Sequence, residues 1–369
     1  MTALRDHCLA EILGQPAAFR RAATAVSAQA DVLRALAARG AGGGAAGPLV
    51  LAGMGSSHDA CLAAAATLGS AGVLATTVEA AELLHVRRAA LAGPGLLVLV
   101  SQSGESAEVV RLAEEVRGLD ADRRPLVLAI TNGAGSPLAA LADLALDTDA
   151  GRENCPSTMT FAGSLVVLAA VTGILAGGSV EAVIADVRAA AAAAATASAE
   201  LLAAPDETGE RLFAWLGGRP TIVALGRGTG LAAAEMTALT LMEAAGVPAT
   251  ALATAEFRHG PLEILGPDVA VVLFALEPAT EPLDRAFAAE LAATGAAVLL
   301  VGPGAAAPPG TPAPPAPPGV ESIPVPGPRG ILAPAVALGP LQLLARRLAH
   351  ARGRRPGAFV HAAKVTTRE

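Results

Sequence analysis

The chain of 369 residues has little of what nucleic-acid or metal binding requires. It contains no tyrosine, only 2% aromatic residues and a single lysine, Lys364. With few aromatic rings for base stacking, no basic cluster and a net charge of −7, nucleic acid is not expected as the main partner. The three cysteines, Cys8, Cys61 and Cys155, form neither an even disulfide set nor a metal-binding spacing, which favours a reducing cytoplasm and predicts no metal site.

Long hydrophobic segments are also missing, although 53% of the residues are hydrophobic. Glycine, proline or a charged residue interrupts each apolar run before it reaches the length of a membrane span. The first residues, Met1–Cys8, show no basic segment followed by an apolar core, so no secretory signal is expected. We therefore expect a cytoplasmic protein that does not use a membrane as a partner.

Short apolar runs alternate with helical patterns along the whole chain, which predicts an α/β fold with parallel sheets. The alternation restarts after a break at 203–207, so we expect two similar domains, residues 1–203 and 204–369. A helical pattern over 9–36 contains Pro16, which predicts a turn or break within that helix. The runs that predict strands are 49–53, 73–79, 96–100, 125–130, 144–148, 221–225, 269–274 and 297–301.

Polar residues with hydroxyl groups follow the apolar run at 96–100 and precede a helical pattern at 107–116. A strand, a hydroxyl-rich turn and a helix together aim backbone N–H groups and the positive end of the helix dipole at an anion. An ordinary N-cap would need one such residue, whereas this turn has five uncharged polar or glycine positions in six. The sequence therefore predicts a phosphate or similar anion bound by Ser101, Gln102, Ser103, Gly104 and Ser106.

A second loop of the same kind follows the apolar run at 49–53. Ser56 and Ser57 stand there between a strand and the helical stretch 59–68. Because ligands of parallel sheets bind beyond the carboxyl ends of the strands, both serine-bearing loops are expected to converge on one site.

Three residues outside these loops are candidates for chemistry. Glu243 lies near the C-terminal end of a predicted helix, where the helix dipole disfavours a carboxylate, although a solvated surface glutamate is the commoner situation. His259 precedes Gly260-Pro261 and is held on a loop, which suits an acid or base as well as a structural role. Lys364 can attack a carbonyl as an amine, unless it is simply the one lysine left in a chain that prefers arginine.

Several motifs at consistent spacing give the chain a resemblance to a known family. It resembles the sugar isomerase (SIS) domain family, in particular the isomerase half of the glutamine–fructose-6-phosphate aminotransferases and their stand-alone relatives. The resemblance implies two tandem SIS domains, each a nucleotide-binding-like αβα sandwich of three layers, a homodimer with shared active sites, and a sugar-phosphate ligand. The motifs are Glu11-Ile-x-x-Gln-Pro16, Gly53-Met-Gly-Ser-Ser57, Ser101-Gln-Ser-Gly-Glu-Ser106, Glu256-Phe-Arg-His-Gly-Pro261 and Ala363-Lys364 through Glu369.

The resemblance also implies roles for single residues. Glu243 matches the glutamate that moves a proton between C1 and C2 of the sugar, and Lys364 matches the lysine that forms a Schiff base with the open-chain ketose. His259 matches the histidine that opens the ring and commonly comes from the partner subunit. Glu153 matches a loop carboxylate near the sugar, with Ser157 beside it. No cofactor is needed for this chemistry, and the phosphate ligands implied are Ser56, Ser57, Ser101, Gln102, Ser103 and Ser106.

Departures from the family pattern shape the functional hypothesis. Thr240 stands where the family has a lysine, and Cys155–Met159 is shorter than the usual loop and lacks its lysine. The chain also begins without the glutaminase domain of the aminotransferases. We therefore expect deamination with isomerisation of an aminosugar phosphate such as glucosamine 6-phosphate to a ketose phosphate and ammonia. The alternatives are a fructosamine 6-phosphate deglycase, a plain aldose–ketose isomerase, and a sugar-phosphate sensor without turnover.

Overall fold

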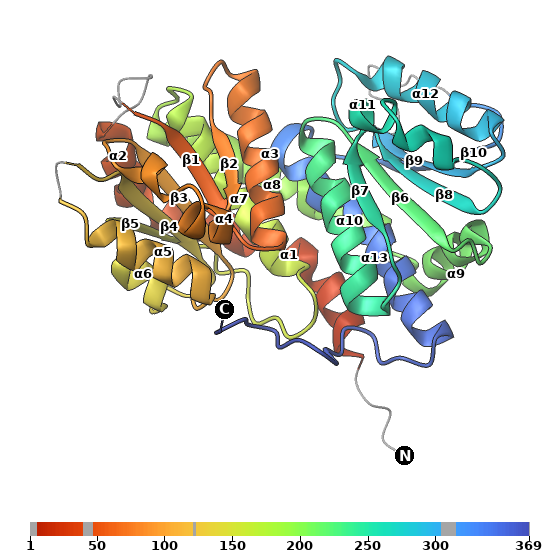
Figure 1. The fold of residues 1–369 in the computed structure, drawn as a ribbon, viewed down its shortest axis with the longest axis horizontal. Helices are drawn as coiled ribbons and strands as arrows, with labels where there is room; N and C mark the ends of the chain where they lie inside the picture. The colour runs from red at the N-terminus through yellow and green to blue at the C-terminus, as the bar shows by residue number, and fades with distance from the viewer. Residues whose placement is uncertain (1–5, 40–46, 121–122, 304–314, 369) are drawn as a thin grey trace. The chain divides into compact units, whose positions relative to one another are not determined.

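The protein divides into two compact units, each built around one five-stranded sheet. The computed structural model describes residues 6–39, 47–120, 123–303 and 315–368 (Figure 1). The last residue of the predicted tail motif, Glu369, lies outside these residues. We call Gln15–Glu153, Ser157–Ala192 and Val360–Glu369 the first-sheet unit. Met1–Gly14, Asn154–Pro156 and Ala193–Phe359 form the second-sheet unit.

Each end of the chain belongs to the unit that is built mainly from the opposite half of the sequence. The segment Met1–Gly14 belongs to the second-sheet unit, and the tail Val360–Glu369 belongs to the first-sheet unit. The tail, which carries Lys364, therefore lies in the same unit as the serine-bearing loops. The boundary at 203 and 204 remains a prediction.

The first sheet is wholly parallel, as predicted, with the strand order β2-β1-β3-β4-β5. Its central strand β3 is buried along its entire length, which explains its uninterrupted apolar sequence. The strands are β1 (Leu49–Gly53), β2 (Thr76–Glu79), β3 (Leu96–Ser101), β4 (Leu126–Thr131) and β5 (Leu144–Asp147).

Helices cover both faces of this sheet and make three layers. Leu97 and Leu99 of β3 pack with α4, α5 and α6 in one core cluster. Figure 1 shows α5 and α6 over this face, and α3 and α7, which contact each other, over the opposite face. The helices are α2 (Ala30–Ala38), α3 (Ser56–Ser70), α4 (Ala80–His85), η1 (Arg88–Leu91), α5 (Ala107–Arg117), α6 (Pro137–Leu141) and α7 (Met159–Leu175). The helix that follows, α8 (Val180–Leu201), begins in this unit and ends in the second-sheet unit.

The second sheet repeats this arrangement with the order β10-β9-β8-β6-β7. Phe257 and Phe287 pack with the strands on one face, while α10 contacts β6 and α13 on the other. The strands are β6 (Thr221–Gly226), β7 (Thr250–Ala253), β8 (Val269–Phe274), β9 (Ala297–Pro303) and β10 (Val320–Val325). The helices are α9 (Pro205–Leu216), α10 (Thr229–Ala245), α11 (Thr254–Phe257), η2 (Pro261–Ile264), α12 (Glu281–Ala293), η3 (Gly330–Leu332) and α13 (Ala333–Ala351).

One helix differs from the sequence-based expectation. The first helix, α1 (His7–Ala28), continues through Pro16, so the predicted break at that proline was wrong. The chain leaves helical geometry at Gln29 instead, where φ is −103° and ψ is 25° before α2 begins. Proline removes one backbone donor and crowds one turn, a local cost that packing offsets here: Ile12 and Phe19 of this helix are at most 1% exposed.

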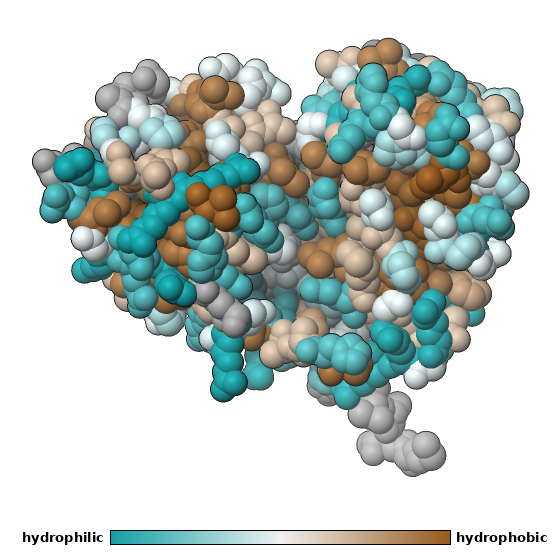
Figure 2. All heavy atoms as spheres, in the orientation of Figure 1, coloured by the Kyte–Doolittle hydropathy of each residue, from teal (hydrophilic) through white to brown (hydrophobic). Residues whose placement is uncertain are grey.

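Two helices have the length and hydropathy of a membrane span, Val180–Leu201 and Gly330–Ala351. In the second of them, 89% of the apolar window is buried inside the protein. Core helices of water-soluble proteins share this length and composition, so these helices are weak evidence for a membrane. On the face drawn in Figure 2, hydrophilic and hydrophobic side chains are interspersed over both units.

Candidate active site

The serine loop, residues 101–106, joins β3 to α5 at the carboxyl edge of the first sheet. Gly104 has a φ of +64°, and a Cβ there would lie 2.3 Å from Ser136 Oγ, so a glycine is required. The Gly104 N–H donates to Ser101 Oγ at 3.2 Å, and Ser101 Oγ lies 3.3 Å from Ser106 Oγ. The turn is therefore tight and brings these hydroxyl groups together.

The helix after the serine loop begins without a side-chain cap. Ser106 is the N-cap of α5 and makes no capping hydrogen bond with its side chain. The first N–H of the helix, on Ala107, donates to the carbonyl of Thr366 in the C-terminal tail at 3.0 Å. Exposed donors at a helix start carry partial positive charge and attract anions. The tail residue next but one to Lys364 thus lies against the predicted anion site.

The second predicted loop lies beside the first, because β1 pairs with β3 in parallel. Gly55, with a φ of +50°, precedes α3, and Ser57 at the helix start is 8% exposed. Ser56 Oγ donates to Ser157 Oγ at 2.9 Å, which joins this loop to the segment that follows Glu153. Three chain segments that the sequence singled out therefore meet at one edge of the first sheet.

His58 follows these serines, and its imidazole contributes little positive charge. Burial lowers its pKa below the usual histidine value, an effect that the carboxylate of Glu79 opposes. Its Nδ1 atom is buried and, among the described residues, has no hydrogen-bond partner. The imidazole is thus expected to be neutral at neutral pH and adds no positive charge to the serine-bearing loops.

Lys364 forms an ion pair with Glu153. Nζ of the lysine lies 3.0 Å from Oε2 of the glutamate, whose side chain is fully buried, while the lysine side chain is 21% exposed. Glu153 Oε1 accepts the Thr158 N–H at 2.8 Å and the Thr160 N–H at 3.1 Å. The hydroxyl groups of Thr158 and Thr160 donate to the same carboxylate at 3.1 and 2.5 Å. The carboxylate therefore binds the start of α7 and the tail amine at once.

Two residues to which the sequence analysis assigned no role, Asn132 and Glu11, hold the segment around Glu153 from both sides. Asn132, after β4, accepts the Ala150 N–H at 2.7 Å and donates to the Gly151 carbonyl at 2.9 Å. Within the second-sheet unit, Glu11 accepts the Asn154 N–H at 2.8 Å and the Cys155 N–H at 3.0 Å. This contact gives a structural reason for the glutamate in the Glu11-Ile-x-x-Gln-Pro16 motif.

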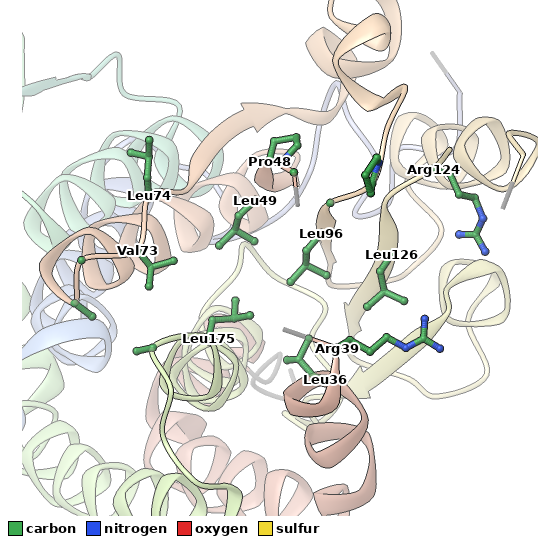
Figure 3. A pocket seen from close by; sticks show the side chains of 16 residues that line it. Leu36, Arg39, Pro48, Leu49, Val73, Leu74, Leu96, Arg124, Leu126 and Leu175 are labelled. Atoms are coloured by element: carbon green, nitrogen blue, oxygen red, sulfur yellow. The ribbon is translucent and has the colours of Figure 1, made fainter. Parts of the chain in front are cut away.

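Two hollows formed by described residues of the first-sheet unit differ in their lining. A polar one of about 420 Å³ lies at the carboxyl edge, where Gln102 of the serine loop and Glu153 both line it. The other, of about 840 Å³, lies at the amino ends of the strands, where Figure 3 shows Leu49, Leu96 and Leu126 around it. The second hollow is lined mainly by leucine, proline and glycine, so the convergent polar groups that chemistry needs are at the first.

Glu243 and His259 lie in the second-sheet unit, and both are exposed. Glu243 is near the end of α10, and His259 follows α11, with its N–H donated to the Glu256 carbonyl at 2.9 Å. On α10, burial and the charge of Glu256 raise the pKa of Glu235 above its ordinary value. Thr240 is 5% exposed, and its hydroxyl has no hydrogen-bond partner among the described residues.

Within the described residues, no group of three or more histidine, cysteine, aspartate or glutamate side chains is arranged to hold a metal ion. Cys8 and Cys155 are buried in one core cluster of the second-sheet unit with Ile12, Leu202 and Leu343. A hydrogen bond with Cys155, together with burial, raises the pKa of the Cys8 thiol. These cysteines are therefore packed as small apolar residues in reduced form.

Comparison with known proteins decides the family. The model of the SIS domain matches residues 45–172 and 217–303, more than half of the chain and one segment from each sheet. The chain belongs to the SIS domain family. The resemblance inferred from the sequence motifs is thus confirmed, as is the α/β fold with two parallel sheets.

Relatives and solved structures agree with this membership. The chain is 30% identical over 366 residues to the glutamine–fructose-6-phosphate aminotransferase of Aeropyrum pernix, covering 98% of this chain and 57% of that protein. Several other relatives are covered over only 34 to 44% of their length. Among structures, the C-terminal domain of the glucosamine-fructose-6-phosphate aminotransferase from Francisella tularensis matches with a TM-score of 0.80 and 22% identity, covering 95% of this chain and 97% of that one. The glucosamine-6-phosphate deaminase from Thermotoga maritima matches with a TM-score of 0.67 and 20% identity, covering 94% and 99%.

Proposed function

We propose that this SIS protein is an enzyme that deaminates and isomerises an aminosugar phosphate, converting a glucosamine 6-phosphate-like substrate to a ketose phosphate and ammonia. The observation that carries the proposal is the position of Lys364. Its amine is 3.0 Å from a fully buried carboxylate, and the tail reaches the start of α5 through Thr366. These two contacts support a role for Lys364 as an amine nucleophile beside a loop suited to an anion.

The serine-bearing loops account for the phosphate end of the substrate. Hydroxyl groups of Ser56, Ser57, Ser101, Ser103 and Ser106 would donate to the phosphate oxygens, together with backbone N–H groups of α5 other than that of Ala107. Gln102, which borders the polar hollow, would contact the phosphate or the neighbouring hydroxyl groups of the sugar.

The chemistry proceeds at the other end of the substrate. After His259 assists ring opening, Glu243 moves a proton from C2 to C1, which converts the C1 aldehyde and C2 amine into a C1 alcohol and a C2 imine. Lys364 Nζ then displaces ammonia from C2, and water hydrolyses the lysine imine to the ketose and the free amine. Both roles outside the first-sheet unit are carried over from the family resemblance.

Glu153 has a role distinct from sugar binding in this proposal. Among the described residues, its hydrogen bonds go to Thr158, Thr160 and Lys364, and its side chain is not exposed. Before Nζ attacks a carbon it must lose a proton, and Glu153 Oε2 is an acceptor within hydrogen-bond distance. We therefore assign Glu153 to the positioning of Lys364, with Ser157 left as a ligand of the sugar.

Trapping of the imine tests the proposal directly. The protein is incubated with fructose 6-phosphate, reduced with borohydride and analysed by peptide mass spectrometry. Because Lys364 is the only lysine, a reduced adduct on a lysine side chain can have only one location. Lys364→Arg keeps the positive charge but cannot form the imine at neutral pH, so it is the matched control. Equal labelling of both proteins would refute the role of Lys364.

Ammonia release from glucosamine 6-phosphate decides the reaction. The wild-type protein should release ammonia and ketose in equal amounts, and Lys364→Arg should release neither. Formation of ketose from glucose 6-phosphate without ammonia would identify a plain isomerase, and turnover of fructosamine 6-phosphates alone would identify a deglycase. Binding of fructose 6-phosphate without any product would identify a sensor.

The assembly is part of the same proposal. By resemblance to the family, we propose a homodimer in which His259 of one chain serves the site of the other. Light scattering of the purified protein should give twice the mass of the 369-residue chain. Mixing inactive Lys364→Arg and His259→Ala chains should then restore part of the activity, which a monomer could not do.

A further inference from the structure

The two sheets have the same strand order, so each element of one unit has a counterpart in the other. The order β2-β1-β3-β4-β5 matches β7-β6-β8-β9-β10, which pairs β6 with β1 and β8 with β3. The helix α10 is then the counterpart of α3. Gly55 and Gly228 precede these helices with nearly equal dihedral angles, φ 50° and ψ −128° against φ 52° and ψ −125°. The backbone therefore starts both helices in the same conformation.

The loops beside these helix starts carry opposite chemistry. After β3 the first sheet offers the hydroxyl groups of the serine loop, which suit a bound anion. After β8 the second sheet offers the carboxylate of Glu277 instead. Its Oε1 accepts the Thr229 N–H at 2.8 Å and the Thr229 hydroxyl at 2.6 Å, and a Cβ on Gly228 would lie 2.6 Å from the same oxygen. The chain thus places an anion of its own at the start of α10.

The arginine that precedes Gly228 is already paired within the unit. Arg227, in the turn before α10, donates from Nε to Asp284 Oδ1 at 2.9 Å, and the Thr280 hydroxyl donates to Asp284 Oδ2 at 3.0 Å. The Asp284 side chain is 1% exposed. The positive group nearest to the glycine-rich turn is therefore already paired, and Thr229 is 2% exposed beneath the carboxylate of Glu277.

We propose that Glu277 is an internal anion that fills the second-sheet counterpart of the serine-loop site, and that its removal opens this position to a free oxyanion such as phosphate. Only the comparison with the serine loop rests on the proposed function, because the bonds from Thr229 to Glu277 stand independently of it. The consequence is that each chain binds one sugar phosphate although it contains two SIS sheets.

Thermal unfolding of Glu277→Ser with inorganic phosphate tests this inference. The variant removes the carboxylate and leaves two buried donors of Thr229 without their acceptor, so its Tm should fall by roughly 5 °C in a chloride buffer. Phosphate at equal ionic strength should then raise the Tm of the variant by more than it raises that of the wild type, because it binds only the folded form at the new site.

Glu281→Ser is the matched control, because Glu281 lies four residues further on and pairs with Arg285 at 3.2 Å rather than with α10. It should respond to phosphate as the wild type does. An equal phosphate response in Glu277→Ser and the wild type, or an unchanged Tm in chloride, would overturn the inference. Calorimetric titration with fructose 6-phosphate should give one site per wild-type chain, and two sites would overturn it too. If the wild type binds no sugar phosphate while Glu277→Ser still shows the extra phosphate response, the proposed function is refuted and the inference about Glu277 stands.

Discussion

Replacing Glu153 by alanine should destabilise the protein severely, because water does not reach this carboxylate and cannot replace it as a hydrogen-bond acceptor. Its side chain is fully buried and accepts hydrogen bonds from the backbone N–H groups of Thr158 and Thr160, both at most 3% exposed. Each buried donor left unsatisfied costs about 1–3 kcal/mol, and breaking a buried ion pair costs about 3–5 kcal/mol in total. Lys364 is partly solvated and adds little, so we expect a loss of about 4 kcal/mol.

Glu153→Gln should cost less, about 1–2 kcal/mol, because its remaining oxygen still accepts from Thr158 and Thr160 while its amide faces the Lys364 amine. Urea unfolding followed by circular dichroism would measure both variants. Glu105→Ala changes an exposed glutamate of the serine loop and should stay within about 0.5 kcal/mol of the wild type. A loss below about 1 kcal/mol for Glu153→Ala would show that the carboxylate does not hold the start of α7 and the tail together.

Three further predictions concern single side chains. Ser101→Ala removes a buried hydroxyl of the serine loop and should weaken fructose 6-phosphate binding about tenfold in calorimetric titration, whereas unchanged affinity would move the phosphate elsewhere. Thr240→Val removes a buried hydroxyl without a partner among the described residues and should raise the free energy of unfolding by up to about 1 kcal/mol, with Thr240→Ser as the neutral control. A hydrogen bond from Arg124 lowers the pKa of Asp143. Asp143 therefore stabilises the fold above its ordinary pKa of about 4 and loses this contribution as the pH falls, so the stability gap to Asp143→Asn should close in acid and persist if the reasoning is wrong.

The sequence predicted the strands of both sheets well wherever burial made them continuously apolar. The run at 269–274 coincides with β8, because a central parallel strand is covered on both faces. The elements that were missed include β7, a four-residue edge strand with an exposed first residue, and α9, whose Pro205 looked like a break but occupies the first turn of a helix. Pro16 was misjudged in the same way, since α1 continues through it. A proline alone does not tell whether packing outweighs its local cost.

In the candidate site, features formed by consecutive residues could be predicted, and contacts between residues far apart in the sequence could not. The serine loop could be predicted because strand, turn and helix are consecutive in the sequence. The ion pair of Glu153 with Lys364 could not, since 211 residues separate the two side chains and no periodicity links them. Glu11 accepts backbone hydrogen bonds from Asn154, 143 residues further along the chain, and from Cys155. In the sequence it could be named only as the first residue of a motif. The contact of Glu11 with the loop backbone gives a physical reason for a glutamate at this position of the motif.

Glutamates from loops bind the starts of two helices. In the first-sheet unit, Glu153 supplies the negative charge at the start of α7, and in the second-sheet unit Glu277 supplies it at the start of α10. The starts of α3 and α5 lie at adjacent strands beside the serine-bearing loops, and each carries an acidic residue in its own first turn, Asp59 in α3 and Glu108 in α5. A phosphate bound there therefore depends on the hydroxyl and N–H donors of the serine-bearing loops more than on the charge of the helix starts.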